Sequence, residues 1–361
     1  MVALTQLLVV NSGSSSLRVS LFRGEEDVRH FHYARTVDHQ AALRRVLREL
    51  AGVSLDGVVH RLVHGGDAQD AARIVDAKER RRLESLIPLA PLHLPANLAG
   101  LDLCAEHFDV PQIACFDTAF HGTLAPLAYR LPIPDRFQLR KYGFHGLSYG
   151  HVAYRLPLLL GEQAKGNVVV AHLGQGASLC LLKDLRSVDT TMGFSPAGGV
   201  VMGTRSGDLD PGVMLALAGR LSVADLSNVV YHEMGLWALS RGNSADMQQL
   251  LQDEGEDARF AVRYFCRHVC QAIGSLAAQA GGLDVLVFTG GIGEKGGLVR
   301  AEVCRSLGFM GFHIDGQANA QNQERISTEE SRPILVLSAD EEDQMRRLSL
   351  ELLVSRSPEQ R

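Results

Sequence analysis

The sequence predicts a two-lobed α/β protein, and three observations carry that prediction. Short apolar runs rich in Val and Leu alternate along the chain with longer segments of helical periodicity, the pattern of strands followed by helices. Residues 6–22 and residues 167–182 share one pattern: an apolar strand, a turn of small residues and a second strand. The length of 361 residues is typical of about two domains.

The individual elements follow from the same patterns, taken in chain order. Apolar runs of strand length predict strands at residues 6–11, 17–22, 28–34, 57–63, 167–173, 178–183, 284–289 and 333–338. Helical periodicity predicts helices at 39–51, 77–86, 146–158, 222–232, 244–253, 257–281, 295–307 and 340–354.

The two strand–turn–strand segments are typical of phosphate binding. Their turns are Asn11-Ser-Gly-Ser-Ser-Ser16 and His172-Leu-Gly-Gln-Gly176. Glycine allows backbone angles closed to other residues, small side chains let backbone N–H groups face an anion, and serine hydroxyls add donors. One such hairpin in each half indicates two lobes that bind one phosphate chain between them.

Composition excludes several classes of partner. The net charge of −5 argues against nucleic acid or an anionic membrane, and no apolar run approaches the ~20 residues of a membrane span. No signal peptide is recognisable, so we expect a cytoplasmic protein. None of the six cysteines forms a CxxC pair, and Cys266 and Cys270 share a helix face, which favours core cysteines over a metal site.

Four loops carry residues suited to phosphoryl chemistry. Arg61 lies on a buried strand that ends in two glycines, and Asp117 follows in a small-residue turn. His145 stands between glycines, and Arg205 lies in a glycine-rich loop. Two arginines, a histidine and a carboxylate suit phosphoryl transfer, because charge spreads over the equatorial oxygens of the moving group.

These motifs together resemble the acetate/propionate kinase family of the actin-like ATPase superfamily. The matching segments are Asn11–Ser16, His60–Gly66, Pro91–Pro95, Asp117–His121, Tyr142–Gly146, His172–Gly176, Met202–Asp208 and Thr289–Glu294. The resemblance implies a duplicated, ribonuclease H-like fold with an active-site cleft between its lobes. It places an N-terminal domain at residues 1–118, with helix 345–361 packing back on it, and a nucleotide-binding domain at 119–344.

The resemblance also implies the activity: reversible transfer of a phosphoryl group from ATP to acetate, giving acetyl phosphate and ADP, in a homodimer. Arg61, Asp117, His145 and Arg205 would be catalytic, and Asn11 and Glu341 would hold Mg²⁺, for which Mn²⁺ can substitute. Arg61 with Val63, Leu92, Phe144 and Pro196 would bind the acyl substrate. The nucleotide would contact Ser14, Ser16, Arg18, His172, Gly174, Gln175, Gly176, Asp246, Gln248, Gly291, Ile292, Gly293 and Lys295.

Departures from the family pattern gather on the nucleotide side. The family usually has Lys where this chain has Arg18, Asn where it has Gln175, Arg where it has Gln248 and Asn where it has Lys295. It usually has Pro-Leu-Glu-Gly where residues 196–199 here are Pro-Ala-Gly-Gly. An arginine lost beside adenosine removes a stacking group. Another nucleotide or an inorganic phosphoryl donor therefore stays open beside ATP.

Three alternatives remain at this level. Propionate or butyrate could replace acetate, since one methylene in an apolar pocket is worth only about 1–3 kcal/mol. Gly291-x-Gly293-x-x-Gly296, with Asp315 further on, matches the dinucleotide fingerprint of an oxidoreductase. An inactive actin-like interaction protein would explain the altered nucleotide side, although Arg61, His145, Arg205 and Glu341 are all retained.

Overall fold

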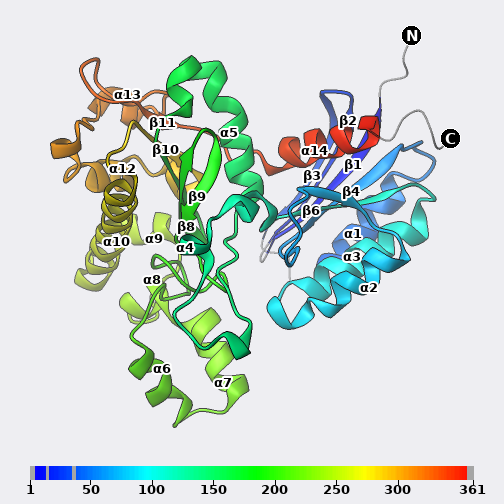
Figure 1. The fold of residues 1–361 in the computed structure, drawn as a ribbon, viewed down its shortest axis with the longest axis horizontal. Coiled ribbons are helices and arrows are strands. Elements are labelled where there is room, and N and C mark those ends of the chain that lie inside the picture. The colour runs from blue at the N-terminus through cyan, green and yellow to red at the C-terminus, as the bar shows by residue number, and fades with distance from the viewer. Residues whose placement is uncertain (1–4, 14–15, 35–37, 356–361) are drawn as a thin grey trace. The chain divides into compact units, whose positions relative to one another are not determined.

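The computed structural model describes residues 5–13, 16–34 and 38–355 and divides the chain into two compact units (Figure 1). The first unit consists of Met1–Gly122 and Asp340–Arg361, and the second of Thr123–Ala339. These boundaries lie a few residues from the domain limits expected from the sequence.

The first unit is built on a mixed six-stranded sheet with strand order β3-β2-β1-β4-β6-β5. Strands β1, β4 and β6 are parallel, whereas β2, β3 and β5 pair antiparallel with their neighbours. The elements are β1 (Gln6–Ser12), β2 (Ser16–Arg23), β3 (Glu26–Ala34), α1 (His39–Glu49), β4 (Gly57–Leu62), β5 (Ala72–Ile74), α2 (Ala77–Ser85), η1 (Ile87–Leu89), α3 (Leu94–His107), β6 (Gln112–Phe116), η2 (Ala119–Thr123) and α14 (Glu341–Ser355).

Helices cover both faces of this sheet. Helices α1 and α3 pack on β2, β4 and β6, while α14 packs on β1, β4, β5 and β6, on the other side of the sheet in Figure 1. The start of α1 is fixed by Asp38, whose carboxylate accepts a hydrogen bond from Ala41 N at 2.8 Å. Leucine and valine from β1, β2, α1 and α3 form one buried core.

The second unit contains a five-stranded sheet with strand order β11-β10-β7-β8-β9, flanked by helices α5 and α10. Its elements are α4 (Pro126–Tyr129), η3 (Asp135–Phe137), α5 (Gly146–Leu160), η4 (Gly161–Lys165), β7 (Val168–Leu173), β8 (Ala177–Lys183), β9 (Arg186–Thr190), α6 (Pro211–Ala218), α7 (Val223–Asn228), the π-helical η5 (Val229–Glu233), α8 (Gly235–Leu239), α9 (Met247–Gln252), α10 (Glu256–Ala280), β10 (Val285–Thr289), α11 (Gly290–Lys295), α12 (Gly297–Cys304), η6 (Gly308–Met310), α13 (Gly316–Ala320) and β11 (Ile334–Val336).

The two sheets repeat one topology. In each, a three-stranded antiparallel meander joins a parallel pair through its first strand, as β3-β2-β1-β4-β6 and as β9-β8-β7-β10-β11. The α/β class is confirmed, and the matching strand orders account for the two similar segments in the sequence. Because β1–β2 and β7–β8 occupy equivalent places, their turns lie at equivalent sheet edges.

Several elements were not expected from the sequence. Helix α3 and strands β5, β6 and β9 lie where no element was predicted. The helix expected at 295–307 is α12, and the short helix α11 precedes it where no helix was expected. The helix expected at 222–232 is α7 followed by a π-helical turn. Within the described part of the chain, no helix combines the length and apolar character that a membrane span needs.

Candidate active site

The residues expected to do chemistry fall into two groups, one in each unit. The first unit contains Asn11, Arg61, Asp117 and Glu341 in mutual contact. The second contains His145, His172 and Arg205 around the β7–β8 turn. The expected nucleotide contact Ser14 lies outside the described residues.

Arg61 is the centre of the group in the first unit. It lies on strand β4 with only 14% of its side chain exposed, and each of its three guanidinium nitrogens donates a hydrogen bond. Nε and Nη2 donate to Asp117, with Nη2 to Oδ2 at 2.7 Å, and Nη1 donates to Glu341 Oε2 at 2.7 Å. The guanidinium is therefore oriented by carboxylates on two sides, a geometry that arginine suits better than lysine.

Asn11 closes the network at the end of β1. Its amide nitrogen donates to Glu341 Oε2 at 2.9 Å and to Glu342 Oε1 at 2.7 Å, while its oxygen accepts from Arg61 Nη1 at 3.1 Å. Arg18 Nη1 lies 3.9 Å from Glu342 Oε1. Arg18, which the resemblance assigned to the nucleotide, thus faces an acid of the same group.

The network carries more acid than base. Among the described residues, Asp117 and Glu341 each lie 2.7 Å from Arg61, and Glu342 lies 3.9 Å from Arg18. Burial raises the pKa of Asp117 to about 6, with Glu341 adding to the rise and Arg61 opposing it. Burial and the Glu341 charge also raise the pKa of Glu342. An additional cation would relieve this excess of negative charge.

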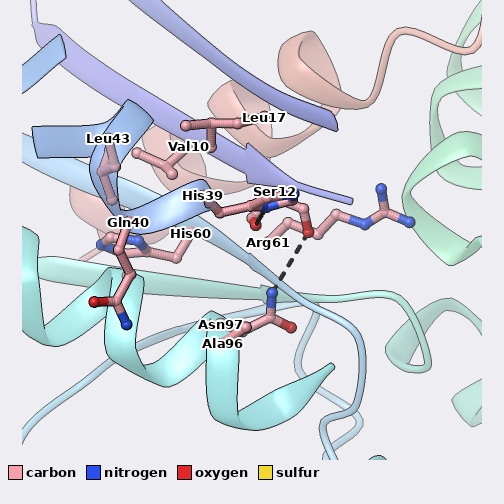
Figure 2. Close-up of a pocket in the computed structure, with 11 residues that line it drawn as sticks. Val10, Ser12, Leu17, His39, Gln40, Leu43, His60, Arg61, Ala96 and Asn97 are labelled. Atoms are coloured by element: carbon pink, nitrogen blue, oxygen red, sulfur yellow. Dashed lines mark hydrogen bonds between the residues drawn. The ribbon is translucent and has the colours of Figure 1, made fainter. Parts of the chain in front are cut away.

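A small pocket of about 20 Å³ lies beside Arg61, between the sheet and helices α1 and α3 (Figure 2). Its wall is largely apolar, and Asn97 Nδ2 donates across it to the Ser12 carbonyl at 3.4 Å. Figure 2 shows the Arg61 guanidinium extending away from the apolar side chains of this pocket. Burial lowers the pKa of the adjoining His60 to about 4, so that ring is neutral near pH 7.

His145 anchors the group in the second unit. It lies just before α5 with φ of 59°, in the left-handed region that residues other than glycine seldom adopt. From there its Nδ1 lies 2.9 Å from Ser178 Oγ on β8. Its ring stacks on that of His172, with centroids 4.2 Å apart. Backbone strain of this kind is characteristic of functional positions.

Arg205 and His145 converge above Gly176. A Cβ built on Gly176 would lie 2.8 Å from Arg205 Nη2 and 3.3 Å from His145 Nε2, so only glycine leaves both side chains in place. Arg205 Nη1 donates to the Pro196 carbonyl at 2.5 Å. Among the described residues, no ion pair includes Arg205, and burial lowers its pKa to about 10. A partly buried guanidinium without a carboxylate is suited to an incoming anion.

The second glycine-rich turn lies beside the end of β10. Strands β7 and β10 are parallel neighbours, and a Cβ on Gly174 would lie 3.9 Å from Gly291 N. His172 Nδ1 is held by Ser148 Oγ at 2.8 Å. The backbone of the β7–β8 turn at Gly174 therefore lies beside the backbone at Gly291, after β10. Adjoining backbone N–H groups of this kind can bind a polyanion.

The remaining predicted positions are more dispersed. Asp246 caps α9 by accepting from Gln248 N at 2.8 Å, and Gln248, Lys295 and Gln175 are exposed. Val63 and Phe144 are buried, Pro196 is partly buried and Leu92 is 46% exposed. Ser16 starts β2, where its carbonyl accepts from Gly13 N at 3.0 Å. Gly291, Ile292 and Gly293 form the first turn of α11.

Sequence reasoning missed four polar residues of these groups. Glu342 bonds Asn11, Ser148 holds His172, and Ser178 and Tyr149 stand behind His145. Consecutive acids at a helix start were the only available signal for Glu342. Asp315, which supported the dinucleotide alternative, instead caps α13 by accepting from Ala318 N at 2.8 Å.

Comparison with known proteins gives consistent relatives. An acetate kinase of Nitrobacter hamburgensis is 44% identical over 318 residues, spanning 86% of this chain and 78% of that protein. A propionate kinase of Citrobacter rodentium is 39% identical over 345 residues, spanning 90% and 85% of the two chains. The crystal structure of Porphyromonas gingivalis acetate kinase superposes with a TM-score of 0.86 at 31% identity, covering 97% of this chain and all of that one.

The family model described as the acetokinase family matches residues 23–347. That range contains Arg61, Asp117, Glu341, His145, His172 and Arg205, whereas Asn11, its turn and Arg18 precede it. The dinucleotide-oxidoreductase alternative is not supported by these relatives. The chain belongs to the acetokinase family.

Proposed function

We propose that this protein transfers a phosphoryl group reversibly between ATP and acetate, giving acetyl phosphate and ADP. The observation that carries the proposal is Arg205, which has no carboxylate partner within the described part of the chain and converges with His145 above Gly176. Two cationic or hydrogen-bonding groups aimed at one small space provide a site for the equatorial oxygens of a transferring phosphoryl group. Names of the relatives support the same activity.

Arg61 is proposed to bind the acyl substrate in the same reaction. Its guanidinium is fixed by Asp117 and Glu341, so binding a substrate carboxylate would cost it little further conformational freedom. Asp117 positions Arg61 rather than acting as a base, because a carboxylate nucleophile is already ionised at neutral pH. Catalysis then depends on position and charge.

Asn11 and Glu341 fit a magnesium ion that accompanies the nucleotide. Among the described residues no three His, Cys, Asp or Glu side chains form a metal cluster, so the chain would provide few direct ligands. Magnesium is commonly held in this way, by one or two carboxylates together with water and substrate phosphates. When bound, it would neutralise phosphate charge. Glu342 lies close enough to Asn11, at 2.7 Å, to orient that amide.

Propionate is the second candidate acceptor. A propionate kinase is among the relatives, and Val63 and Phe144 are buried side chains of the proposed acyl pocket. The same residues, with Leu92 and Pro196, would contact the alkyl group of either acid. One methylene distinguishes the two substrates, so both should react.

ATP is the proposed donor, bound along the adjoining turns at Gly174 and Gly291. The Gln175 side chain turns toward Gly203, where a Cβ would lie 2.8 Å from its Nε2. The Gln175 side chain thus packs against the loop that contains Gly203 and Arg205. We expect weak purine selectivity, because Gln248 offers no guanidinium for stacking.

A second copy of the chain is proposed to cover α6 and α7. Val213, Leu215 and Val223 are 44%, 75% and 87% exposed, and α6 buries none of its residues. Clustered apolar side chains of this kind are typical of interfaces. Light scattering should give the dimer mass, and Leu215→Glu should give the monomer; a monomeric unmodified protein would contradict the proposal.

One panel of assays tests the activity. Acetate, propionate and butyrate are each combined with ATP, GTP and pyrophosphate in the presence of Mg²⁺, and acyl phosphate is trapped as the hydroxamate. Acetate with ATP should give the largest kcat/KM. Failure of every combination would overturn the proposal and favour an inactive interaction protein, whereas turnover with pyrophosphate alone would correct only the donor.

A further inference from the structure

Arg300 is a fully buried arginine whose partners, within the described part of the chain, include no carboxylate. It lies on α12 with none of its side chain exposed. Nε donates to Asn319 Oδ1 at 2.8 Å, and Nη2 donates to the Asn319 carbonyl at 2.8 Å and to Asn322 Oδ1 at 2.6 Å. Nη1 donates to the carbonyls of Gly293 and Glu294, at 2.7 and 2.9 Å. These bonds use all the N–H groups of the guanidinium.

The positive charge of Arg300 is solvated by neutral acceptors and is not cancelled. Burial lowers the pKa of the guanidinium, but arginine stays protonated in proteins. Acids on the neighbouring elements are engaged elsewhere: Glu294 Oε1 accepts from Ala339 N at 2.9 Å, and Glu302 pairs with Arg305 at 2.6 Å. A buried charge without an opposite charge is costly, so a function that uses the charge is worth seeking.

The bonds from Nη1 place this charge at one end of α11, the helix that begins with the turn proposed to bind the nucleotide. Gly291 lies in the first turn of α11, and Gly293 and Glu294 lie toward its other end. The six residues of α11 span about 9 Å. Arg300 therefore anchors α11 through its carbonyl groups, and its charge lies about one length of this short helix from Gly291.

Building on the proposed function, we infer that Arg300 is a positioning residue for the phosphate chain of the nucleotide, which it serves by anchoring α11 and by placing an uncancelled positive charge behind the turn at Gly291. It acts through α11 and does not touch the nucleotide. A nucleoside diphosphate or triphosphate, or pyrophosphate, gains from the charge. A nucleoside without phosphate gains only from the anchored backbone, so the two effects can be measured separately.

Asn322→Asp tests the charge while keeping the geometry. The carboxylate would take the place of the amide and accept from Arg300 Nη2 as Asn322 Oδ1 does now. Aspartate tolerates the left-handed φ of 52° at this position. The ADP Kd, measured by calorimetry on the full-length protein, should rise about two- to twentyfold, the effect of unit charges about 9 Å apart at effective dielectric constants between about 80 and 20. Adenosine, measured by its competition with ADP, should bind as before.

Gln323→Glu is the matched control for the added negative charge. The Gln323 side chain is exposed and donates to Gln321 Oε1 at 2.8 Å, not to Arg300. This variant should leave the ADP Kd unchanged. An unchanged ADP Kd in Asn322→Asp, or an equal rise in Gln323→Glu, would overturn the role of the Arg300 charge.

Arg300→Lys and Arg300→Met separate the charge from the anchoring. Lysine keeps the charge with fewer donors, whereas methionine keeps neither. Both variants should weaken adenosine and ADP binding by loosening α11, but only Arg300→Met should weaken ADP more than adenosine. The same ratio of ADP to adenosine affinity in the two variants would contradict the inference. If Arg300→Met does not fold, which thermal unfolding would reveal, Asn322→Asp still decides the question.

Assays of the unmodified protein distinguish this inference from the proposed function. A raised ADP Kd in Asn322→Asp, together with no acyl phosphate from the unmodified protein, would overturn only the proposed function. Normal acyl phosphate formation with an unchanged ADP Kd in Asn322→Asp would overturn only the inference. Failure of both ADP and pyrophosphate to bind the unmodified protein would overturn the inference together with the proposed donor site.

Discussion

Gly176→Ala should damage turnover far more than stability. The added methyl carbon would lie 2.8 Å from Arg205 Nη2 and 3.3 Å from His145 Nε2, whereas ordinary contact begins at 3.4 Å. The guanidinium must therefore retreat by 3.4 − 2.8 = 0.6 Å, and the imidazole by 3.4 − 3.3 = 0.1 Å. Gly176 is not among the glycines with positive φ, so alanine meets crowding there but no backbone strain.

The expected size of the effect follows from that displacement. A misplacement of about 1 Å costs on the order of 10²-fold in rate, so we expect kcat to fall roughly ten- to a hundredfold. This corresponds to about 1.4–2.7 kcal/mol of transition-state stabilisation. The KM for ATP should change less, because the displaced group is Arg205 and not the backbone of the turn.

Steady-state hydroxamate assays and thermal unfolding measure the two effects separately. Gly193→Ala is the matched control, because a Cβ at that position meets no atom within 4 Å. Its kcat should equal that of the unmodified protein. If Gly176→Ala retains kcat within twofold, Arg205 and His145 do not act at the place where they converge, and the proposed geometry is refuted.

Further perturbations address the other groups. Arg205→Ala should lower kcat on the order of 10³-fold, the scale of an arginine on a phosphoryl transition state, with nucleotide affinity nearly kept; near-normal kcat would refute its role. Because burial raises the pKa of Asp117 to about 6, protonation below that pH removes the carboxylate from Arg61, so kcat/KM should fall as pH decreases through about 6. The Asp117→Asn variant should have a low kcat/KM that does not fall further as pH decreases through this range. If the fall remains in that variant, a group other than Asp117 is responsible for it. Gln248→Arg should tighten ATP, by up to about tenfold for a gained stacking contact, without changing the acetate KM; tighter acetate instead would show that Gln248 lines the other pocket. Asp246→Ala should lower the free energy of unfolding by about 1 kcal/mol through loss of the α9 cap, a loss that chemical denaturation would either detect or exclude.

The sequence allowed the α/β class and the duplicated hairpins to be predicted because each rests on local patterns. Helix α3 was missed because its apolar residues, including Leu98 and Leu101, are not confined to one stripe. Strand β6 is a buried run of five residues, too short for periodicity to distinguish strand from helix. Both elements depend on burial from neighbours that a local pattern does not reveal.

The candidate site was predictable where glycines surround a charged residue, as at His145 and Arg205. Ser178 and Tyr149 could not be found in this way. Ser178 is placed by the register that pairs it with His172 across β7 and β8, and Tyr149 reaches it from one turn along α5. Register and helix rotation become known only in three dimensions, so a hydroxyl inside an apolar strand gave no functional signal.

Helix α14 has a consequence for the way the protein is made. The ribosome releases this helix after the second unit, yet its Glu341 binds Arg61 and Asn11, and its buried Met345 and Ser349 lie against Cys115 of the first unit. During translation, the face of that sheet on which α14 packs stays uncovered until the whole second unit has been synthesised. A messenger truncated before codon 340 would thus yield a chain with an intact second unit and an exposed apolar sheet face, a product prone to aggregation and open to proteolytic disposal.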